Sequence, residues 1–218
     1  MPDPKRKIYE FAGDGLTVRW DLKRCIHAEE CVHRLPKVFD PQKRPWIEAG
    51  LATAEEVRDT VMSCPTGALH YEPTDGGRAE PTPQSNRIAV GPDGPLYISG
   101  DLSIGLPSGH TTHDNRVALC RCGDSKNKPF CDNTHLDTGF SDDGHLGESK
   151  LGTPEIEGSG IAISLAADGP LILSGEMTAD GPGSEPQTGT RAALCRCGAS
   201  QNKPYCDGAH RTIGFSSA

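Results

Sequence analysis

The sequence predicts an α+β protein in which a small N-terminal module of strands and helices precedes a larger β-rich unit. Two observations predict this fold class. Roughly the first third of the chain alternates β-prone apolar runs with helical patterns. The rest repeats itself at a constant offset of 75 residues, and its short apolar runs are separated by glycine and proline. We therefore expect one mixed module followed by two related β-rich copies.

The N-terminal module, residues 1–73, begins with a predicted β-hairpin. Ile8–Phe11 and Leu16–Trp20 are apolar, β-prone runs, and the segment between them, Gly13-Asp14-Gly15, is typical of a tight turn. A short helix is expected over residues 28–34, because Pro36 would end it.

The second half of this module is expected to contain a strand, a helix and a closing strand. The short strand is expected at residues 45–47. Thr53 and Glu56 have the spacing of a capping box and open the helix, and the closing strand is expected at residues 68–71. The predicted order of elements is β-β-α-β-α-β.

Residues 74–85, TDGGRAEPTPQS, contain glycine, proline and charge without an apolar period, which indicates a linker. The first copy of the repeat follows at residues 86–145. A polar, glycine-rich connector is expected at residues 146–160, and the second copy at residues 161–218. Short strands are predicted in the first copy and, 75 residues later, in the second: 88–90, 96–98 and 117–119.

The composition limits the classes of partner. Only 34% of the 218 residues are hydrophobic, and small modules with modest cores usually need a staple such as a metal. The net charge of −8 argues against nucleic acid and anionic membranes as partners. No apolar run approaches the roughly 18 residues of a membrane span, and no secretory segment follows the first methionine. We expect a protein of the cytoplasm.

The nine cysteines divide into three groups of three. An odd number does not suit a disulfide framework, and a reducing compartment with three cofactor sites fits the count better. The groups are Cys25, Cys31 and Cys64; Cys120, Cys122 and Cys131; and Cys195, Cys197 and Cys206.

Two of these groups lie in a repeated motif. Cys120–His135 reads CRCGDSKNKPFCDNTH and Cys195–His210 reads CRCGASQNKPYCDGAH. Each offers three thiols and one imidazole, which are ligands for iron-sulfur clusters and for zinc. The spacing alone leaves both metals open, with disulfides as a third alternative. The candidate ligands are Cys120, Cys122, Cys131 and His135 in the first copy and Cys195, Cys197, Cys206 and His210 in the second.

Both copies resemble the CDGSH iron-sulfur family, in which the last cysteine is followed by Asp-Gly and a small residue before the histidine. The second copy fits this pattern throughout, while the first has Asn133 in place of the glycine. Asparagine tolerates a left-handed backbone best among non-glycine residues, so we expect the turn to form. Further residues at matching family positions are Ser125 and Ser200, Pro129 and Pro204, and Asp132 and Asp207.

The resemblance implies one 2Fe-2S cluster per copy, held by three cysteines and one histidine. Family members often form two-cluster dimers around an intertwined β-cap. The two copies are therefore expected to build a pseudo-two-fold tandem CDGSH unit within one chain, which implies a monomer. Asp132 and Asp207 follow a ligand directly, and we expect their carboxylates to cap free backbone N–H groups rather than act in catalysis.

The remaining cysteines, Cys25, Cys31 and Cys64-Pro65, resemble those of monocluster bacterial ferredoxins, which have three cysteines in the first group and a distant Cys-Pro. Ala28 occupies the position of the middle cysteine, and its methyl group cannot bind iron. The resemblance therefore implies a ferredoxin-like domain with a 3Fe-4S cluster.

Two alternatives remain for these three cysteines. The first is a 4Fe-4S cluster with water, His27 or His33 on the fourth iron, and the second is an ordinary core that contains three buried thiols.

No set of nucleophile, base and orienting residue is visible, and no phosphate-binding or dinucleotide-binding glycine motif. We expect a non-enzymatic electron carrier with a redox partner protein, either a reductase or an acceptor. One alternative is a cluster donor to an apo-acceptor, or a redox or pH sensor, with labile histidine ligation. The other is a zinc-stapled interaction module.

Overall fold

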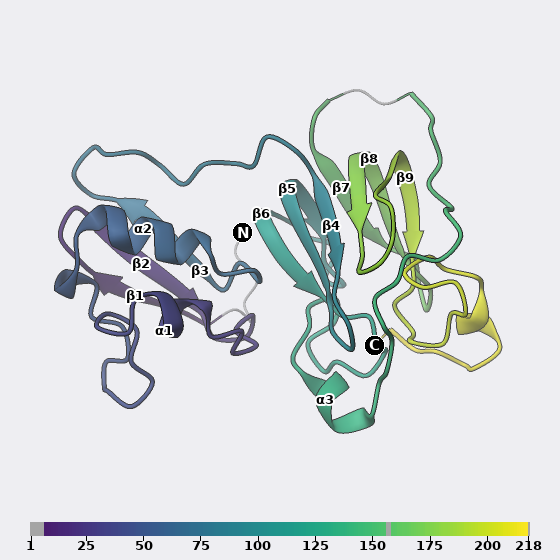
Figure 1. The fold of residues 1–218 in the computed structure, drawn as a ribbon, viewed down its shortest axis with the longest axis horizontal. Coiled ribbons are helices and arrows are strands. Elements are labelled where there is room, and N and C mark those ends of the chain that lie inside the picture. The colour runs from purple at the N-terminus through teal and green to yellow at the C-terminus, as the bar shows by residue number, and fades with distance from the viewer. Residues whose placement is uncertain (1–6, 156–157, 218) are drawn as a thin grey trace. The chain divides into compact units, whose positions relative to one another are not determined.

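The computed structural model describes residues 7–155 and 158–217, and the chain divides into two compact units (Figure 1). The first unit ends at Pro81 and the second begins at Thr82, a boundary inside the stretch that was expected to be a linker. Residues 1–6 of the predicted N-terminal domain, residues 156–157 of the predicted connector and residue 218 of the second copy lie outside the described residues.

The first unit contains a three-stranded antiparallel sheet in the order β1-β2-β3. The predicted hairpin is confirmed: β1 and β2 pair, and Gly15 has a φ of +74° in the turn between them. The closing strand, β3, pairs with β2, so the sheet is a simple antiparallel arrangement closed by a distant segment. The strands are β1 (Ile8–Ala12), β2 (Leu16–Asp21) and β3 (Leu69–Pro73).

Helix α2 (Ala54–Met62) follows the predicted capping box. The backbone N–H of Glu56 donates to the Thr53 hydroxyl (3.3 Å), and the backbone N–H of Thr53 donates to the Glu56 carboxylate (2.9 Å). The buried face of α2 packs with the sheet in one core, which includes Val57, Val61, Leu16, Val18, Leu69 and Tyr71.

Two predictions for this unit are corrected: the first helix is present but shorter than expected, and the strand at residues 45–47 is not formed. Helix α1 spans only Glu30–Arg34, because His27 and Glu29 have positive φ angles of 53° and 61°, which a helix does not tolerate. The strand expected at residues 45–47 is a single bridge between Ile47 and Phe39, since Pro45 has no N–H to donate to a ladder. With the short 3-10 helix η1 (Ala49–Leu51) before α2, the order is β-β-α-α-β.

The second unit is built on a six-stranded sheet to which each copy of the repeat contributes three strands. Within each copy the strands pair in an antiparallel manner, in chain order. The predicted strands are present, and several are longer than expected. They are β4 (Arg87–Val90), β5 (Leu96–Gly105) and β6 (Thr111–Leu119), then β7 (Ile161–Leu165), β8 (Leu171–Asp180) and β9 (Gln187–Leu194).

The two copies also exchange strands. β4 of the first copy pairs in parallel with β8 of the second, and β7 of the second pairs in parallel with β5 of the first. The registers are reciprocal: Arg87 faces Thr178, and Ala162 faces Ser103, with each residue 75 positions from its counterpart. The second unit is thus an intertwined pseudo-two-fold arrangement within one chain, with a single shared hydrophobic core.

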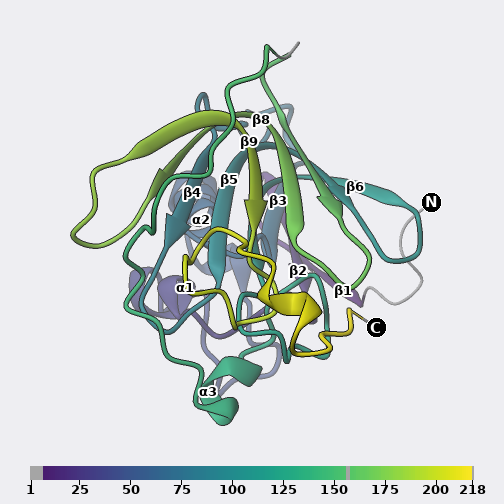
Figure 2. The same cartoon turned by 90° about the vertical axis from the view of Figure 1, so that its right-hand side faces the viewer.

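The chain leaves β6 and β9 into two long loops that gather at one end of the strands (Figures 1 and 2). These loops carry the two repeated motifs and contain α3 (Thr134–Thr138) and the 3-10 helix η2 (Ala209–Arg211). The expected connector is not an isolated linker, because Leu146 is buried in the shared core and Gly152 forms a bridge with Arg191.

Candidate metal centres

Backbone hydrogen bonds fold each motif loop back onto the strand that precedes it. The N–H of Cys120 donates to the carbonyl of Pro129 (2.8 Å), and the N–H of Cys131 donates to the carbonyl of Ala118 (3.0 Å). The third cysteine is thereby held beside the Cys-x-Cys pair. The second motif repeats both bonds, from Cys195 to Pro204 (2.7 Å) and from Cys206 to Ala193 (2.8 Å).

A buried serine braces the middle of each loop. The Ser125 hydroxyl donates to the carbonyl of Phe130 (2.7 Å) and accepts from the N–H of Asn127 (3.0 Å). Ser200 makes the equivalent bonds to Tyr205 (2.6 Å) and Asn202 (3.1 Å). These family-matching serines therefore hold the shape of each loop.

The aspartate after the third cysteine caps the turn that carries the histidine. Asp132 accepts from the N–H of Thr134 (3.1 Å) and from the N–H of Lys126 across the loop (2.8 Å). Asp207 accepts from the N–H groups of Ala209 (2.9 Å) and Gln201 (2.8 Å), and these bonds hold its pKa below the ordinary value. The expected capping role is confirmed.

The substitution of Asn133 for glycine is accommodated as predicted. Asn133 has a φ of 71° and Gly208, at the same position of the second motif, has a φ of 94°. Both residues are left-handed, so the turn between the third cysteine and the histidine forms in both copies.

The four candidate ligands of each motif lie in two close pairs. In the first motif, the sulfurs of Cys120 and Cys122 are 3.6 Å apart, and the Cys131 sulfur is 3.5 Å from Nδ1 of His135. The corresponding distances in the second motif are 3.8 Å and 3.4 Å. Two ligands of one tetrahedral metal lie about 3.5–3.8 Å apart, so each pair has the spacing of a two-ligand contribution to a single ion.

Several of these thiols hold their protons at neutral pH, so metal binding must release protons. A hydrogen bond from the Cys122 thiol lowers the pKa of Cys120 to about 6, so this pair shares one proton. Burial raises the pKa of Cys131 and that of Cys197 to about 11. Metal ligation needs thiolates, and therefore metal uptake must displace protons from these sites.

The two motif loops touch each other through glycines next to the ligands. A Cβ added to Gly123, whose φ is 99°, would lie 2.8 Å from the carbonyl oxygen of Cys197. Gly198, with a φ of 80°, approaches the carbonyl oxygen of Cys122 in the same way. Both the backbone conformation and the close approach require glycine here.

One pair of residues beside the ligands was missed in the sequence. Arg121 and Arg196 lie between the first two cysteines of each motif and are each only 1% exposed. Arg121 donates to the carbonyls of Gly94 (2.9 Å) and Gly91 (2.7 Å), and Arg196 to those of Gly169 (3.0 Å) and Ala166 (2.7 Å). The identical arginine in both Cys-Arg-Cys segments was the available signal.

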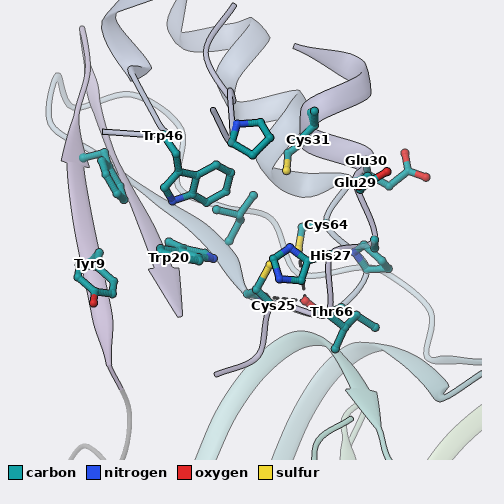
Figure 3. A pocket seen from close by; sticks show the side chains of 18 of the residues that line it. Tyr9, Trp20, Cys25, His27, Glu29, Glu30, Cys31, Trp46, Cys64 and Thr66 are labelled. Carbon is teal, nitrogen blue, oxygen red and sulfur yellow. Dashed lines mark hydrogen bonds between the residues drawn. The ribbon is translucent and has the colours of Figure 1, made fainter. Parts of the chain in front are cut away.

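The three cysteines of the first unit come from three elements (Figure 3). Cys25 follows β2, Cys31 lies in α1, and Cys64 comes just after α2. The buried Arg24 donates to the carbonyl of Thr66 (2.8 Å) and ties the first loop to the last. All three thiols line one cavity of about 460 Å³, whose walls include Trp20, Trp46, Ile26 and Leu69.

The structure distinguishes between the two histidines considered for a fourth ligand. Ala28 and His27 both line the cavity with the three thiols. His33 is not among the residues that line it, and its Nε2 is 3.4 Å from the carboxylate of Glu29. Burial raises the pKa of Cys31 to about 12, and burial also raises that of Cys25. The cavity is thus an apolar chamber with three thiols on its wall.

Comparison with known families agrees with these sites. Residues 11–73 match a family described as a divergent 4Fe-4S mono-cluster, and residues 93–136 and 168–211 both match the iron-binding zinc finger of CDGSH type. The chain is an iron-sulfur protein with an N-terminal divergent mono-cluster domain and two CDGSH-type domains. The two matches in the CDGSH domains contain every ligand pair described above.

The curated relatives cover part of this CDGSH protein. Uncharacterized protein YjdI of Escherichia coli K12 is 36% identical over 64 residues, which is 28% of this chain and 80% of YjdI. The protein of the same name from Escherichia coli O157:H7 matches to the same extent. No solved structure matches this chain. Within residues 7–155 and 158–217, no helix has the length and apolar character needed to cross a membrane.

Proposed function

We propose that this CDGSH protein is a non-enzymatic electron carrier with one 2Fe-2S cluster in each CDGSH domain and a larger cluster in the mono-cluster domain. The observation that carries the proposal is the division of each CDGSH ligand set into two pairs, with separations of 3.4–3.8 Å. A binuclear cluster needs two ligands on each of two irons, and each motif offers this arrangement.

The grouping of the ligands into pairs favours iron over zinc. A Cys3His zinc site needs four ligands that converge on one ion. In the described part of the chain, no group of three or more Cys, His, Asp or Glu side chains has that arrangement, whereas the two-ligand pairs are present twice. The zinc-stapled interaction module is therefore the less favoured alternative.

For the mono-cluster domain we propose a 3Fe-4S cluster on Cys25, Cys31 and Cys64. Three thiols line the apolar cavity and Ala28 lines it as well, so one corner of a cubane lacks a thiolate. The alternative is a 4Fe-4S cluster, the type that the matching family description names, with His27 or water on the fourth iron.

Electron transfer is favoured by the rigidity of the ligand loops. Each CDGSH loop is held by two backbone hydrogen bonds, a buried serine and an aspartate cap. A site that is held on all sides changes oxidation state with little rearrangement. The partner would be a reductase or an acceptor protein. We further propose that the protein is a monomer, because the intertwined pair of copies is complete within one chain. We also propose that it lies in the cytoplasm, because its nine cysteines suit a reducing compartment.

One observation favours the second candidate function, donation of a cluster or sensing through a labile histidine. His135 is 8% exposed, whereas His210 and Cys206 in the second CDGSH domain are partly exposed. Solvent therefore reaches the second site more easily than the first.

The test is an iron and sulfide assay with EPR on the purified protein. The proposal expects a coloured protein with seven irons per chain, in groups of three, two and two, which reduces and reoxidises without loss of iron. A content of eight irons per chain would indicate a 4Fe-4S cluster in the mono-cluster domain instead of 3Fe-4S. A colourless protein that contains zinc would contradict the proposal, and loss of iron to an apo-acceptor without reversible reduction would favour the cluster donor.

A further inference from the structure

The two CDGSH domains differ by one charge beside equivalent buried arginines. Arg121 and Arg196 have the same carbonyl partners in each copy, and each lies over a phenylalanine ring, at 5.2 Å for Phe140 and 5.5 Å for Phe215. The sequence diverges two residues after each phenylalanine. The first copy has Asp142 and the second has Ser217.

In the first copy, the carboxylate of Asp142 forms an ion pair with Arg121, whose side chain is 0% exposed. Asp142 also lies 3.8 Å from the ammonium group of Lys203 and accepts from the N–H of Gly144 (3.0 Å). Only 12% of the Asp142 side chain is exposed. A negative charge is therefore fixed, out of solvent, directly behind the Cys-Arg-Cys segment of the first site.

In the second copy, the same backbone arrangement lacks this charge. The N–H of Ser217 donates to the carboxylate of Asp168 (2.8 Å), as the N–H of Asp142 donates to Asp93 in the first copy (2.7 Å). The Ser217 hydroxyl also bonds to Asp168 (3.1 Å). Among the described residues no carboxylate lies within ion-pair distance of Arg196, although the charge of Asp168 acts on it as that of Asp93 acts on Arg121 in the first copy.

A buried guanidinium affects the two oxidation states of a nearby cluster differently. Reduction adds an electron, and a positive charge in a medium of low dielectric stabilises the more negative form. Asp142 cancels much of that effect at the first site, whereas the second site has Ser217 in the equivalent position. The two motif loops touch, so each arginine also acts on the neighbouring site. The pseudo-two-fold arrangement makes this cross effect the same for both sites. The charge of Asp142, in contrast, has no counterpart in the second copy.

The solvent exposure of the ligands also favours reduction of the second site. The ligands Cys122, Cys131 and His135 of the first site are buried, whereas their counterparts Cys197, Cys206 and His210 are partly exposed. Solvent stabilises the more highly charged, reduced form of a cluster, and this again favours reduction at the second site.

We propose that the second CDGSH site takes up an electron before the first, and that the Asp142/Ser217 difference sets this order. The proposal rests on the proposed function, because it requires a 2Fe-2S cluster in each domain. The first electron that enters the unit would therefore reduce the cluster of the second site, beside Arg196. Asp142 tunes the reduction potential of the first site without binding its cluster.

An EPR-monitored redox titration of the full chain tests the order. The wild type should show two resolved reduction steps for the 2Fe-2S signal. Asp142→Asn keeps the size of the side chain and an acceptor for Gly144. It should raise the potential of the lower step by more than that of the upper step, because Asp142 pairs with the buried Arg121 of the first site and lies farther, at 3.8 Å, from Lys203 of the second motif. Ser217→Asp should lower the upper step while the lower step stays in place. Both changes narrow the difference between the two reduction potentials, the first by raising the lower potential and the second by lowering the upper one.

The controls are Asp143→Asn, which removes an exposed neighbouring charge, and Ser217→Asn, which adds bulk without charge; both should leave the two steps unchanged. A single unresolved step in the wild type, or an Asp142→Asn variant that leaves the lower step unmoved, overturns the order. Absence of any 2Fe-2S signal in the wild type would instead overturn the proposed function. Iron content, measured for each variant, shows whether both sites are filled.

Discussion

The mono-cluster domain and the CDGSH domains present their thiols in opposite ways. In the first, three cysteines from separate elements line an apolar cavity of about 460 Å³, with a methyl group where a fourth ligand is expected. In the others, four ligands from one sixteen-residue loop lie in pairs less than 4 Å apart. The first region therefore offers three thiols around one cavity, whereas the CDGSH loops offer their candidate ligands in close pairs.

The difference also has a structural origin. The mono-cluster cavity is set by tertiary packing, since β2, α1 and the end of α2 must meet before the three thiols face one space. The CDGSH loops are set locally, by bonds between residues at most about a dozen positions apart. We therefore expect loss of one site to leave the others intact.

Removal of one ligand should have the largest effect, the loss of a whole cluster. Cys64→Ala should lower the iron content from seven to about four per chain and leave both 2Fe-2S signals, because the ligand sets share no residue. Cys131→Ala should lower it to about five and leave the mono-cluster signal. Iron assay and EPR check both results, and a Cys64→Ala protein without 2Fe-2S signals would show that the regions are interdependent.

A change of one iron is expected from Ala28→Cys. This substitution places a thiol on the cavity wall at the corner that lacks one, and it should convert a 3Fe-4S site to 4Fe-4S. The characteristic EPR signal of the oxidised three-iron cluster should disappear. Ala12→Cys, at the end of β1 and not among the residues that line the cavity, is the matched control and should retain that signal.

If the wild type already carries four irons here, His27 becomes the residue to test. His27→Ala should then release one iron, because its side chain lines the cavity with the three thiols. His33→Ala should release none, since His33 is paired with Glu29 outside the lining. Equal behaviour of the two variants would point to water as the fourth ligand.

Gly123→Ala should destabilise the CDGSH unit by about 2–5 kcal/mol, because strain at a positive φ adds to a clash with the carbonyl oxygen of Cys197. Gly109 has a φ of 81°, and no atom lies within 4 Å of a Cβ added there. Gly109→Ala therefore separates backbone strain from the clash, and it should lower stability only by the strain. Thermal unfolding of both variants measures the difference. Equal melting temperatures would contradict the inferred contact between the motif loops.

The smallest effect concerns pH and lies in the mono-cluster domain. Hydrogen bonding to the backbone N–H of Thr53 and to Lys37 lowers the pKa of Glu56 to about 2. A lowered pKa means that this stabilisation is present above about pH 4.5 and is lost as the pH falls toward 2. The difference in melting temperature between wild type and Glu56→Gln should therefore shrink from about pH 6 to about pH 3, and a difference that stays constant over this range would contradict the prediction.

What could be predicted from the sequence was local. The hairpin around Gly15, the capping box of Thr53 and Glu56, the aspartate caps and the left-handed Asn133 all depend on residues a few positions apart, and each is confirmed. The ligand residues could be identified because a motif of sixteen residues occurs twice.

What could not be predicted depends on distant contacts. The partners of Arg121 lie 21 to 30 positions away, so its burial had no signature beyond its repetition in both motifs. Residues 45–47 resembled a strand because they are apolar, but Pro45, the first of them, has no N–H to donate and the pairing is a single bridge of Ile47 to Phe39. His27 lines the cavity, whereas His33 pairs with Glu29 outside the lining. This difference could not be predicted without the fold of the Cys25–Cys31 loop.

The exchange of β4 and β7 between the copies has a consequence for how this protein can diversify. In a symmetric homodimer, one codon specifies both halves, so every substitution appears twice and the two metal centres must remain identical. Here both halves belong to one polypeptide and still complete each other's sheet. Each centre can therefore be mutated alone while the shared architecture holds both in place, and positions such as Asp142 and Ser217 record that freedom.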